Sequence, residues 1–141
     1  KTLGKRINDT PGGNVGVERR VAIMYTEMVG RRGYPLEKFV DLVSTNAAKI
    51  MGLYPRKGAI AAGADADIAV LDPGKRFTIR KEMLHEQDYS PWEGHEVHAW
   101  PVLTVMRGKI AVEDGKFAAD LSDGQYLFRE ISEEIRSGAS L

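Results

Sequence analysis

The chain contains no cysteine and only three histidines among its 141 residues, and both shortages restrict the chemistry it can carry. Without cysteine it forms no disulfide and offers no thiolate to a metal, which suits a reducing cytoplasm and equally suits a disulfide-free secreted protein. No apolar run approaches the roughly 20 residues that span a bilayer, and the first residues lack the apolar core of a signal peptide. We expect a cytoplasmic protein.

A net charge is also absent. Twenty lysines and arginines balance twenty aspartates and glutamates, so no positive field attracts nucleic acid or anionic lipid. Hydrophobic residues make up 43% of the chain, as in ordinary folded proteins, and a chain of this length can bury roughly 68% of its unfolded surface around one core. Because the sequence begins with Lys1 rather than methionine, we expect an excerpt or a processed product.

The first part of the sequence has a helical period. Apolar residues recur at intervals of three and four over residues 17–29, and a second apolar stripe follows over residues 35–44. A short third helix is predicted over residues 45–51, with Thr45 or Asn46 as its N-terminal cap. Glycine and proline close this helical part.

Beyond residue 57 the pattern becomes extended. Short apolar runs bounded by turn residues predict strands over residues 66–71 and 77–79, and a hairpin with glycine in its turn over residues 102–112. Residues 85–100 show neither period and predict an ordered loop. The tail, residues 124–136, is predicted to be a helix or an extended arm.

Candidate catalytic groups are few. His95 and His98 could bind a metal together with Glu93 or Glu96, but residues three apart on a strand point to opposite faces. We therefore prefer solvated loop histidines. His85 stands alone and is interpreted as hydrogen-bonded or exposed rather than as a base.

Two aspartates alternate with alanine in a turn. Asp65 and Asp67 would face one side of an extended chain, and paired acids can transfer protons. Asp65 follows Gly63, however, and aspartate in a turn commonly bonds nearby backbone N–H groups. The turn role is the preferred interpretation.

A glycine-rich loop over residues 10–16 precedes the first predicted helix. Its backbone N–H groups can approach a ligand, and a helix start favours a negative or carbonyl oxygen. No Lys-Ser or Lys-Thr follows the last glycine, so it is not a phosphate-binding loop. Residues alone leave two alternatives open: ligand binding by the main chain, or glycines that only set the helix entry.

Residues 11–20, Pro-Gly-Gly-Asn-Val-Gly-Val-Glu-Arg-Arg, resemble the Pro-Asn-Gly-x-x-x-Val-Glu-x-Arg segment of the hydantoinase and dihydropyrimidinase family. Further segments match that family in order and spacing, nearly from end to end. They are residues 39–49, 52–58 and 58–72, then Asp88-Tyr89, Trp92-Glu93-Gly94, Arg107-Gly108 and Gly124-Gln125-Tyr126-Leu127.

This resemblance implies a (β/α)8 barrel enzyme with two divalent metals, usually zinc, bridged by a carbamylated lysine and a hydroxide that attacks a cyclic amide carbonyl. In the family, the metal ligands and the proton-shuttling aspartate precede the Pro-Asn-Gly segment. All of them therefore fall outside this chain, and Asp9 does not take that role. We expect no catalytic residue, no metal ligand and no hydrolase activity in this chain alone.

One family role does fall inside the chain. The asparagine of the Pro-Asn-Gly segment contacts the ring amide of the substrate mainly through its backbone, and the matching position is Gly12. Gly12 is therefore the implied substrate-binding residue, through its main chain. The resemblance also implies a homo-oligomer, a tetramer or a dimer, in which the last segment packs on a neighbouring subunit.

The sequence thus predicts an α/β plus β fold. Residues 1–56 would be the last helices of a (β/α)8 barrel, residues 57–120 the C-terminal half of a small β-sandwich, and residues 121–141 an arm between subunits. The predicted function is that of a fragment of a metal-dependent hydrolase that opens hydantoin or dihydropyrimidine rings. The alternatives are an allantoinase or dihydroorotase-like hydrolase, a non-catalytic dihydropyrimidinase-like assembly protein, and a stand-alone oligomerisation module.

Overall fold

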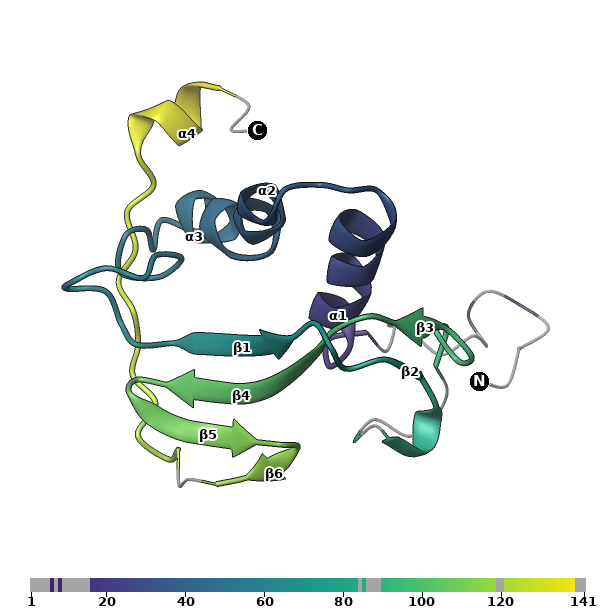
Figure 1. The fold of residues 1–141 in the computed structure, drawn as a ribbon. Coiled ribbons are helices and arrows are strands. Elements are labelled where there is room, and N and C mark those ends of the chain that lie inside the picture. Colours follow the sequence, from purple (N-terminus) through teal and green to yellow (C-terminus); the bar gives the residue numbers. More distant parts are fainter. Residues whose placement is uncertain are drawn as a thin grey trace.

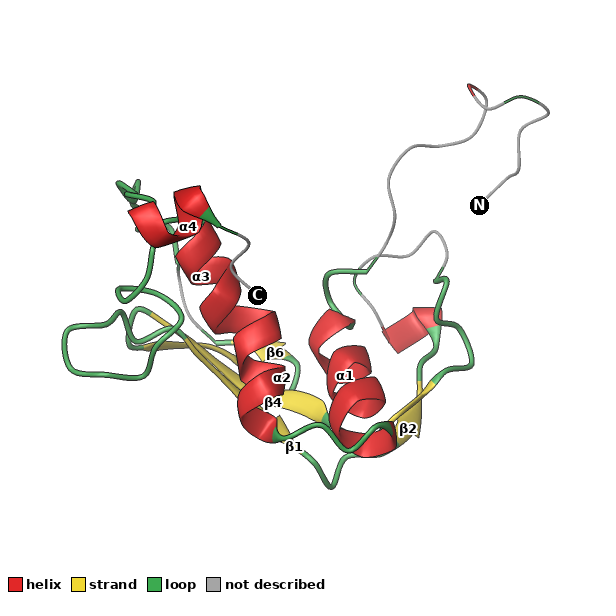
Figure 2. Ribbon diagram, turned by 90° about the horizontal axis from the view of Figure 1, so that it is seen from above, coloured by secondary structure: helices red, strands yellow, loops and turns green. Residues whose placement is uncertain are grey.

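The computed structural model describes residues 6, 8, 16–83, 85, 90–118 and 121–138. Two helical rods lie on one side of an antiparallel sheet, and an extended C-terminal segment runs past the sheet and the second rod (Figure 1). Figure 2 shows that the two rods diverge from the loop that joins them. Among the described residues, no helix combines the length and apolarity needed to cross a bilayer.

The first rod consists of α1 (Arg20–Tyr25), which continues into the π-helical segment η2 (Thr26–Arg31). The second consists of α2 (Leu36–Val40), the π-helical η3 (Asp41–Thr45) and α3 (Asn46–Ile50). The two predicted apolar stripes are therefore confirmed as helices. Gly52 follows the second rod at φ +68°, a left-handed conformation that glycine adopts without steric cost.

The predicted break near residue 45 is wrong, because the second rod is continuous. Thr45 has helical backbone angles, φ −60° and ψ −49°, and caps nothing. Its hydroxyl instead donates a hydrogen bond to the carbonyl oxygen of Gly58 at 3.0 Å. A partner distant in sequence thus satisfies the side chain that the sequence indicated as a cap.

A four-stranded antiparallel sheet, in the order β1-β4-β5-β6, forms the second layer. Its strands are β1 (Ile68–Asp72), β4 (Trp100–Met106), β5 (Lys109–Glu113) and β6 (Lys116–Phe117). The predicted hairpin is confirmed: Arg107 (φ 49°) and Gly108 (φ 77°) both have the positive φ that a tight two-residue turn requires.

A second, two-stranded sheet pairs β2 (Phe77–Thr78) with β3 (Glu96–Val97). The prediction of a loop over residues 85–100 is wrong at β3, since a strand of two residues is too short to show an alternating pattern. A short 3-10 helix, η4 (Lys81–Met83), follows β2.

The best-buried cluster lies between the first rod and the two-stranded sheet. It contains Ala22 and Ile23 of α1 with Ile79 and Val97, and all four are almost fully inaccessible to solvent. Phe77 and Trp100 pack against this cluster, with their ring centroids 4.8 Å apart. The cluster fixes α1 over the start of β4.

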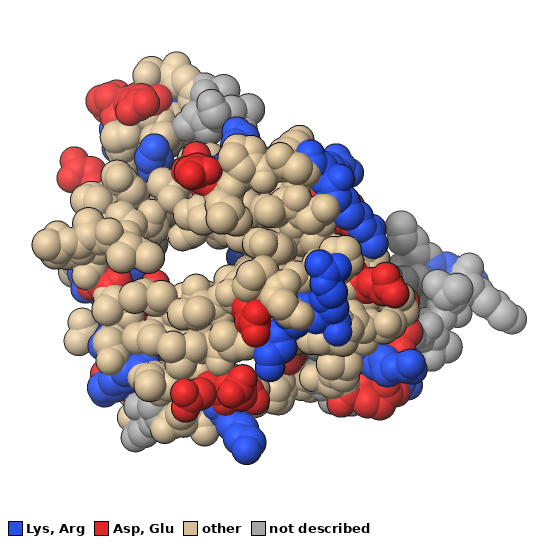
Figure 3. Space-filling model, viewed as in Figure 1, with Lys and Arg blue, Asp and Glu red and all other residues tan. Residues whose placement is uncertain are grey.

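Elsewhere the two layers are not closed against each other. An opening passes between the helical layer and the sheet in the space-filling view (Figure 3). Val40 and Leu42 of the second rod, Val70 of β1 and Ile110 of β5 are exposed. Apolar surface of this extent is usually covered by more protein.

The C-terminal segment is extended over residues 121–132 and ends in the short helix α4 (Glu133–Ser137). The prediction of a helix or an extended arm is confirmed, since both forms occur. Tyr126 and Phe128 on this arm are exposed and contact each other edge to face, with centroids 5.1 Å apart.

Candidate functional site

Gly12, the predicted substrate-binding residue, lies outside the described residues, as does the rest of the loop over residues 11–15. The structure describes the exit from that loop. Gly16 precedes a turn over residues 17–19, and α1 begins directly after the turn. The main-chain role of Gly12 stays a prediction.

Glu18, in the same motif, joins the start of α1 to the segment after η4. One carboxylate oxygen, Oε2, accepts the backbone N–H of His85 at 3.0 Å, and Oε1 lies 2.8 Å from the Nδ1 atom of that histidine. The His85 side chain is otherwise 86% exposed. The prediction that His85 is hydrogen-bonded or exposed is therefore confirmed, and both descriptions hold.

A pocket of about 470 Å³ adjoins this pair. Its lining includes Val17, Trp100, Leu103 and Phe117, besides Glu18 and His85 at its edge. Because the lining is mainly apolar, the pocket suits packing of an apolar group.

His95 and His98 flank β3 and pack against the first rod. The His98 backbone N–H donates to the Thr26 hydroxyl at 2.9 Å, and the His95 ring contacts the Trp92 ring at 5.4 Å between centroids. The His95 side chain is only 22% exposed, with its Nε2 atom 3.6 Å from Oε1 of Glu27. The prediction of solvated histidines is therefore wrong for His95, because its Nε2 atom is buried beside Glu27 of η2.

No group of three or more His, Cys, Asp or Glu side chains in the described part of the chain is arranged to hold a metal ion. His85 is paired with Glu18, and His95 contacts Trp92 and Glu27. The donors that are described therefore do not form a metal site.

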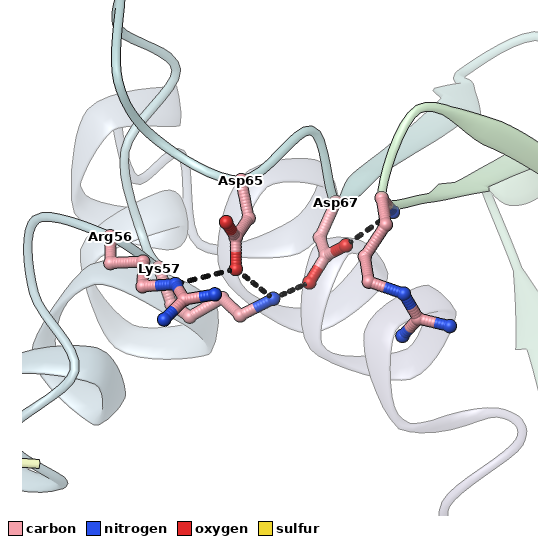
Figure 4. Close-up of polar contacts among 5 residues, drawn as sticks. Arg56, Lys57, Asp65 and Asp67 are labelled. Carbon is pink, nitrogen blue, oxygen red and sulfur yellow. Dashed lines mark hydrogen bonds and ion pairs between the residues drawn. The ribbon is translucent and has the colours of Figure 1, made fainter. Parts of the chain in front are cut away.

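The densest set of charged contacts joins Arg56 and Lys57 to Asp65 and Asp67 (Figure 4). Asp65 accepts a hydrogen bond from Arg56 Nε at 3.0 Å and pairs with Lys57 Nζ at 2.9 Å. Lys57 Nζ also pairs with Asp67. The two aspartates share one face, as the alternation predicted. The predicted turn role of Asp65 is wrong, because its carboxylate bonds cations rather than nearby backbone N–H groups.

Asp67 extends this network to the β4–β5 hairpin. Its Oδ1 atom accepts the backbone N–H of Arg107 at 2.7 Å, and the N–H of Gly108 donates to the carbonyl oxygen of Ala66 at 3.0 Å. The turn before β1 is thereby fixed to the hairpin turn. Both segments were predictable from sequence, but their contact was not.

Asp123 carries the network on to the C-terminal arm. Arg107 Nη2 and Lys109 Nζ lie 2.7 and 3.1 Å from its two carboxylate oxygens. Hydrogen bonds from these cations lower the pKa of Asp123 to about 2. The arm is therefore fastened to the β4–β5 turn by charged groups at its beginning.

The same network shifts the pKa values of its other members. Burial lowers the pKa of Lys57, but hydrogen bonds to Asp67 and Asp65 outweigh that effect and raise it above its ordinary value. The hydrogen bond from Lys57 lowers the pKa of Asp65. Burial raises the pKa of Asp67, and bonds from Lys57 and the Arg107 backbone more than reverse the effect. Every carboxylate here is held ionised, so the network joins segments and supplies no acid or base near neutral pH.

The chain matches a known protein family and several of its members. Residues 10–112 match the family model described as "Amidohydrolase family". The chain is 42% identical over 131 residues to the D-hydantoinase of Geobacillus stearothermophilus, covering 92% of this chain and 28% of that protein. It is 37% identical over 132 residues to the dihydropyrimidinase of Rattus norvegicus, covering 92% of this chain and 25% of that protein.

The fold agrees as well. The structure of a D-hydantoinase from Bacillus sp. AR9 superposes with a TM-score of 0.85 at 40% identity, covering 92% of this chain and 28% of that one. The chain spans about a quarter of the length of the curated relatives it matches, 26% of one D-hydantoinase and 28% of another. Family model, sequence relatives and fold all agree: the chain belongs to the amidohydrolase family and, within it, to the hydantoinase group.

Proposed function

We propose that the chain is the C-terminal portion of a hydrolase that opens cyclic amides, with hydantoin or dihydropyrimidine rings as substrates. The observation that carries this proposal is the match to proteins named D-hydantoinase and dihydropyrimidinase over 92% of the chain. The order of the matching segments supports the same assignment, from the glycine-rich loop at residues 11–16 to the arm at residues 124–127.

Within that hydrolase we assign residues 1–56 to the last helices of a (β/α)8 barrel, residues 57–120 to the C-terminal half of a β-sandwich, and residues 121–141 to an inter-subunit arm. The two helical rods followed by an antiparallel sheet support the first two assignments. The exposed aromatic pair on the arm, Tyr126 and Phe128, supports the third and a homo-oligomer. The absence of cysteine suits a cytoplasmic location.

The reaction needs two divalent metals, zinc in our proposal, to supply a hydroxide and polarise the amide carbonyl. The described residues do not fit such a centre, because they contain no group of three suitable donors. We therefore assign the metal ligands and the catalytic aspartate to the remaining portion of the protein. This chain would contribute the main chain of Gly12 as a contact to the ring amide.

The experiment that tests this function is a substrate panel on the purified full-length protein. Hydantoin and dihydrouracil should be opened, whereas allantoin and dihydroorotate should be poor substrates. Preferential opening of allantoin or dihydroorotate would identify a different cyclic amidohydrolase. A protein that binds no metal and opens none of the four rings would be an assembly protein, and the proposal would be wrong.

A further inference from the structure

Arg19 is a charged side chain that the described structure buries without pairing. It lies at the residue before α1, and none of it is exposed to solvent. Its Nε, Nη1 and Nη2 atoms are all buried, and none has a hydrogen-bond partner within the described part of the chain. The family segment does not prescribe this residue, because Arg19 stands at the variable position between Val-Glu and Arg.

The position of Arg19 on the helix explains its burial. Residues 19, 22, 23 and 26 follow one another at intervals of three and four, so they share one face, and all four are buried. Ala22 and Ile23 on that face belong to the apolar cluster with Ile79 and Val97. Arg19 thus occupies the first position of a stripe that faces the core.

The neighbouring carboxylate does not neutralise this charge. Both oxygens of Glu18 are directed at His85, to its backbone N–H and to its ring. Arginine side chains in proteins do not lose their proton, so deprotonation does not relieve the cost of burying one. A buried charge without a partner would cost a large share of the net stability of a domain.

The turn over residues 17–19, which ends at Arg19, is lightly held. Gly16 has no atom within 4 Å of the position a β-carbon would take, and Val17 is 82% exposed. One long hydrogen bond, from the Arg20 N–H to the Val17 carbonyl at 3.4 Å, closes the turn. A segment arriving from outside could open this turn without disrupting a packed core.

We propose that Arg19 is the receptor for a carboxylate side chain that the remaining portion of the full-length protein brings against the start of α1. The inference rests on the proposed function only in that the chain is one portion of a longer hydrolase. A carboxylate is the partner because its two oxygens match the parallel N–H groups of the guanidinium. The chain spans about a quarter of the length of its relatives, so the remaining portion can provide such a side chain.

The test is the direction in which Arg19→Met changes the melting temperature of the full-length protein. Methionine keeps a long flexible side chain but removes the charge and the donors. If a carboxylate is paired with Arg19, removing the guanidinium leaves that carboxylate buried without a partner, and Tm should fall by about 5 °C or more. The matched control is Arg80→Met, which removes an exposed arginine and should change Tm by less than about 1 °C.

Arg19→Lys keeps the charge without the two-pronged geometry and should lower Tm by an intermediate amount, which also provides a readout if the methionine variant does not fold. A Tm of Arg19→Met that equals or exceeds the Tm of Arg80→Met would overturn the proposal. Such a result would mean that Arg19 is unpaired, because removing an unpaired buried charge does not destabilise a protein. Repeating the melts with formate or sulfate in place of chloride tests the alternative that a dissolved anion, rather than a carboxylate side chain, is the partner of Arg19. If these anions raise the Tm of the wild type but not that of Arg19→Met, the proposal is also overturned. Ring-opening activity, measured on the same samples, reports separately on the proposed function.

Discussion

The backbone N–H of Glu130 donates a hydrogen bond to the carbonyl oxygen of Gly52 at 3.0 Å, and no side chain fits between these two segments. A β-carbon on Gly52 would lie 2.7 Å from the carbonyl carbon of Glu130. This contact and the ion pairs of Asp123 fasten the C-terminal arm at two points, one beside α3 and one beside the β4–β5 turn.

Gly52→Ala should detach the arm from the end of α3. Gly33→Ala is its matched control, because Gly33 has nearly the same φ, +67° against +68°, and nothing lies near its β-carbon position. Both variants should lose about 1 kcal/mol from left-handed backbone strain, and Gly52→Ala about 1–3 kcal/mol more from the clash. Hydrogen exchange of the Glu130 amide should accelerate only in Gly52→Ala. Equal exchange in both variants would show that the arm does not depend on this contact.

The carboxyl of Asp123 should titrate near pH 2 in wild type, because hydrogen bonds from Arg107 and Lys109 hold its pKa at about 2. Since this pKa is below the ordinary aspartate value of 3.8, the ion pairs stabilise the fold fully at pH values above 3.8. Their contribution is lost as pH falls toward 2. Carbon NMR titration should show the pKa rising toward 3.8 in Arg107→Gln and further in the double variant with Lys109→Gln. A wild-type midpoint near 4 would mean that the arm is not held there.

The buried hydroxyl of Thr26 should contribute measurably to stability. It donates to the Ala22 carbonyl oxygen at 2.8 Å and accepts the His98 N–H at 2.9 Å, which joins η2 to the end of β3. Thr26→Val keeps the shape and leaves the His98 N–H without an acceptor, at a cost of about 1–3 kcal/mol in urea unfolding. Thr26→Ser keeps the hydroxyl and should lose less. A valine variant as stable as wild type would show that water replaces this bond.

Gly12→Pro tests the substrate contact that the family resemblance implies. Proline removes the N–H and fixes φ, so kcat/KM of the full-length protein should fall roughly tenfold to a hundredfold. Gly12→Ala controls for general damage to the loop, and Gly12→Asn, which restores the family residue, should be tolerated. If proline leaves kcat/KM within about threefold of wild type and Tm unchanged, Gly12 only sets the helix entry.

Local features of this fold were predictable from sequence, and features that need a distant partner were not. The hairpin at Arg107 and Gly108 depends on backbone conformations that neighbouring residues dictate. Strand β3 depends on pairing with β2, and two residues carry no period of their own. Thr45 looks like a helix cap, yet its hydroxyl bonds Gly58, thirteen residues away.

The charged network shows the same limit. The alternation of Asp65 and Asp67 with alanine predicted that both carboxylates share a face, and Lys57 does contact both. The hydrogen bond between Asp67 and Arg107 joins residues forty positions apart, and only the folded sheet brings these segments together. The burial of Arg19 had no sequence signal, because an arginine at the start of a helix ordinarily faces solvent.

We propose that this chain supplies structural support and a substrate contact, while the metals and the reacting groups belong to the rest of the protein. The most direct measurement is metal content by elemental analysis, together with hydantoin and dihydrouracil hydrolysis, on this chain and on the full-length protein side by side. We expect two bound metals per subunit and turnover for the full-length protein, and neither for the chain alone. Two tightly bound metals with turnover in the chain alone would contradict it.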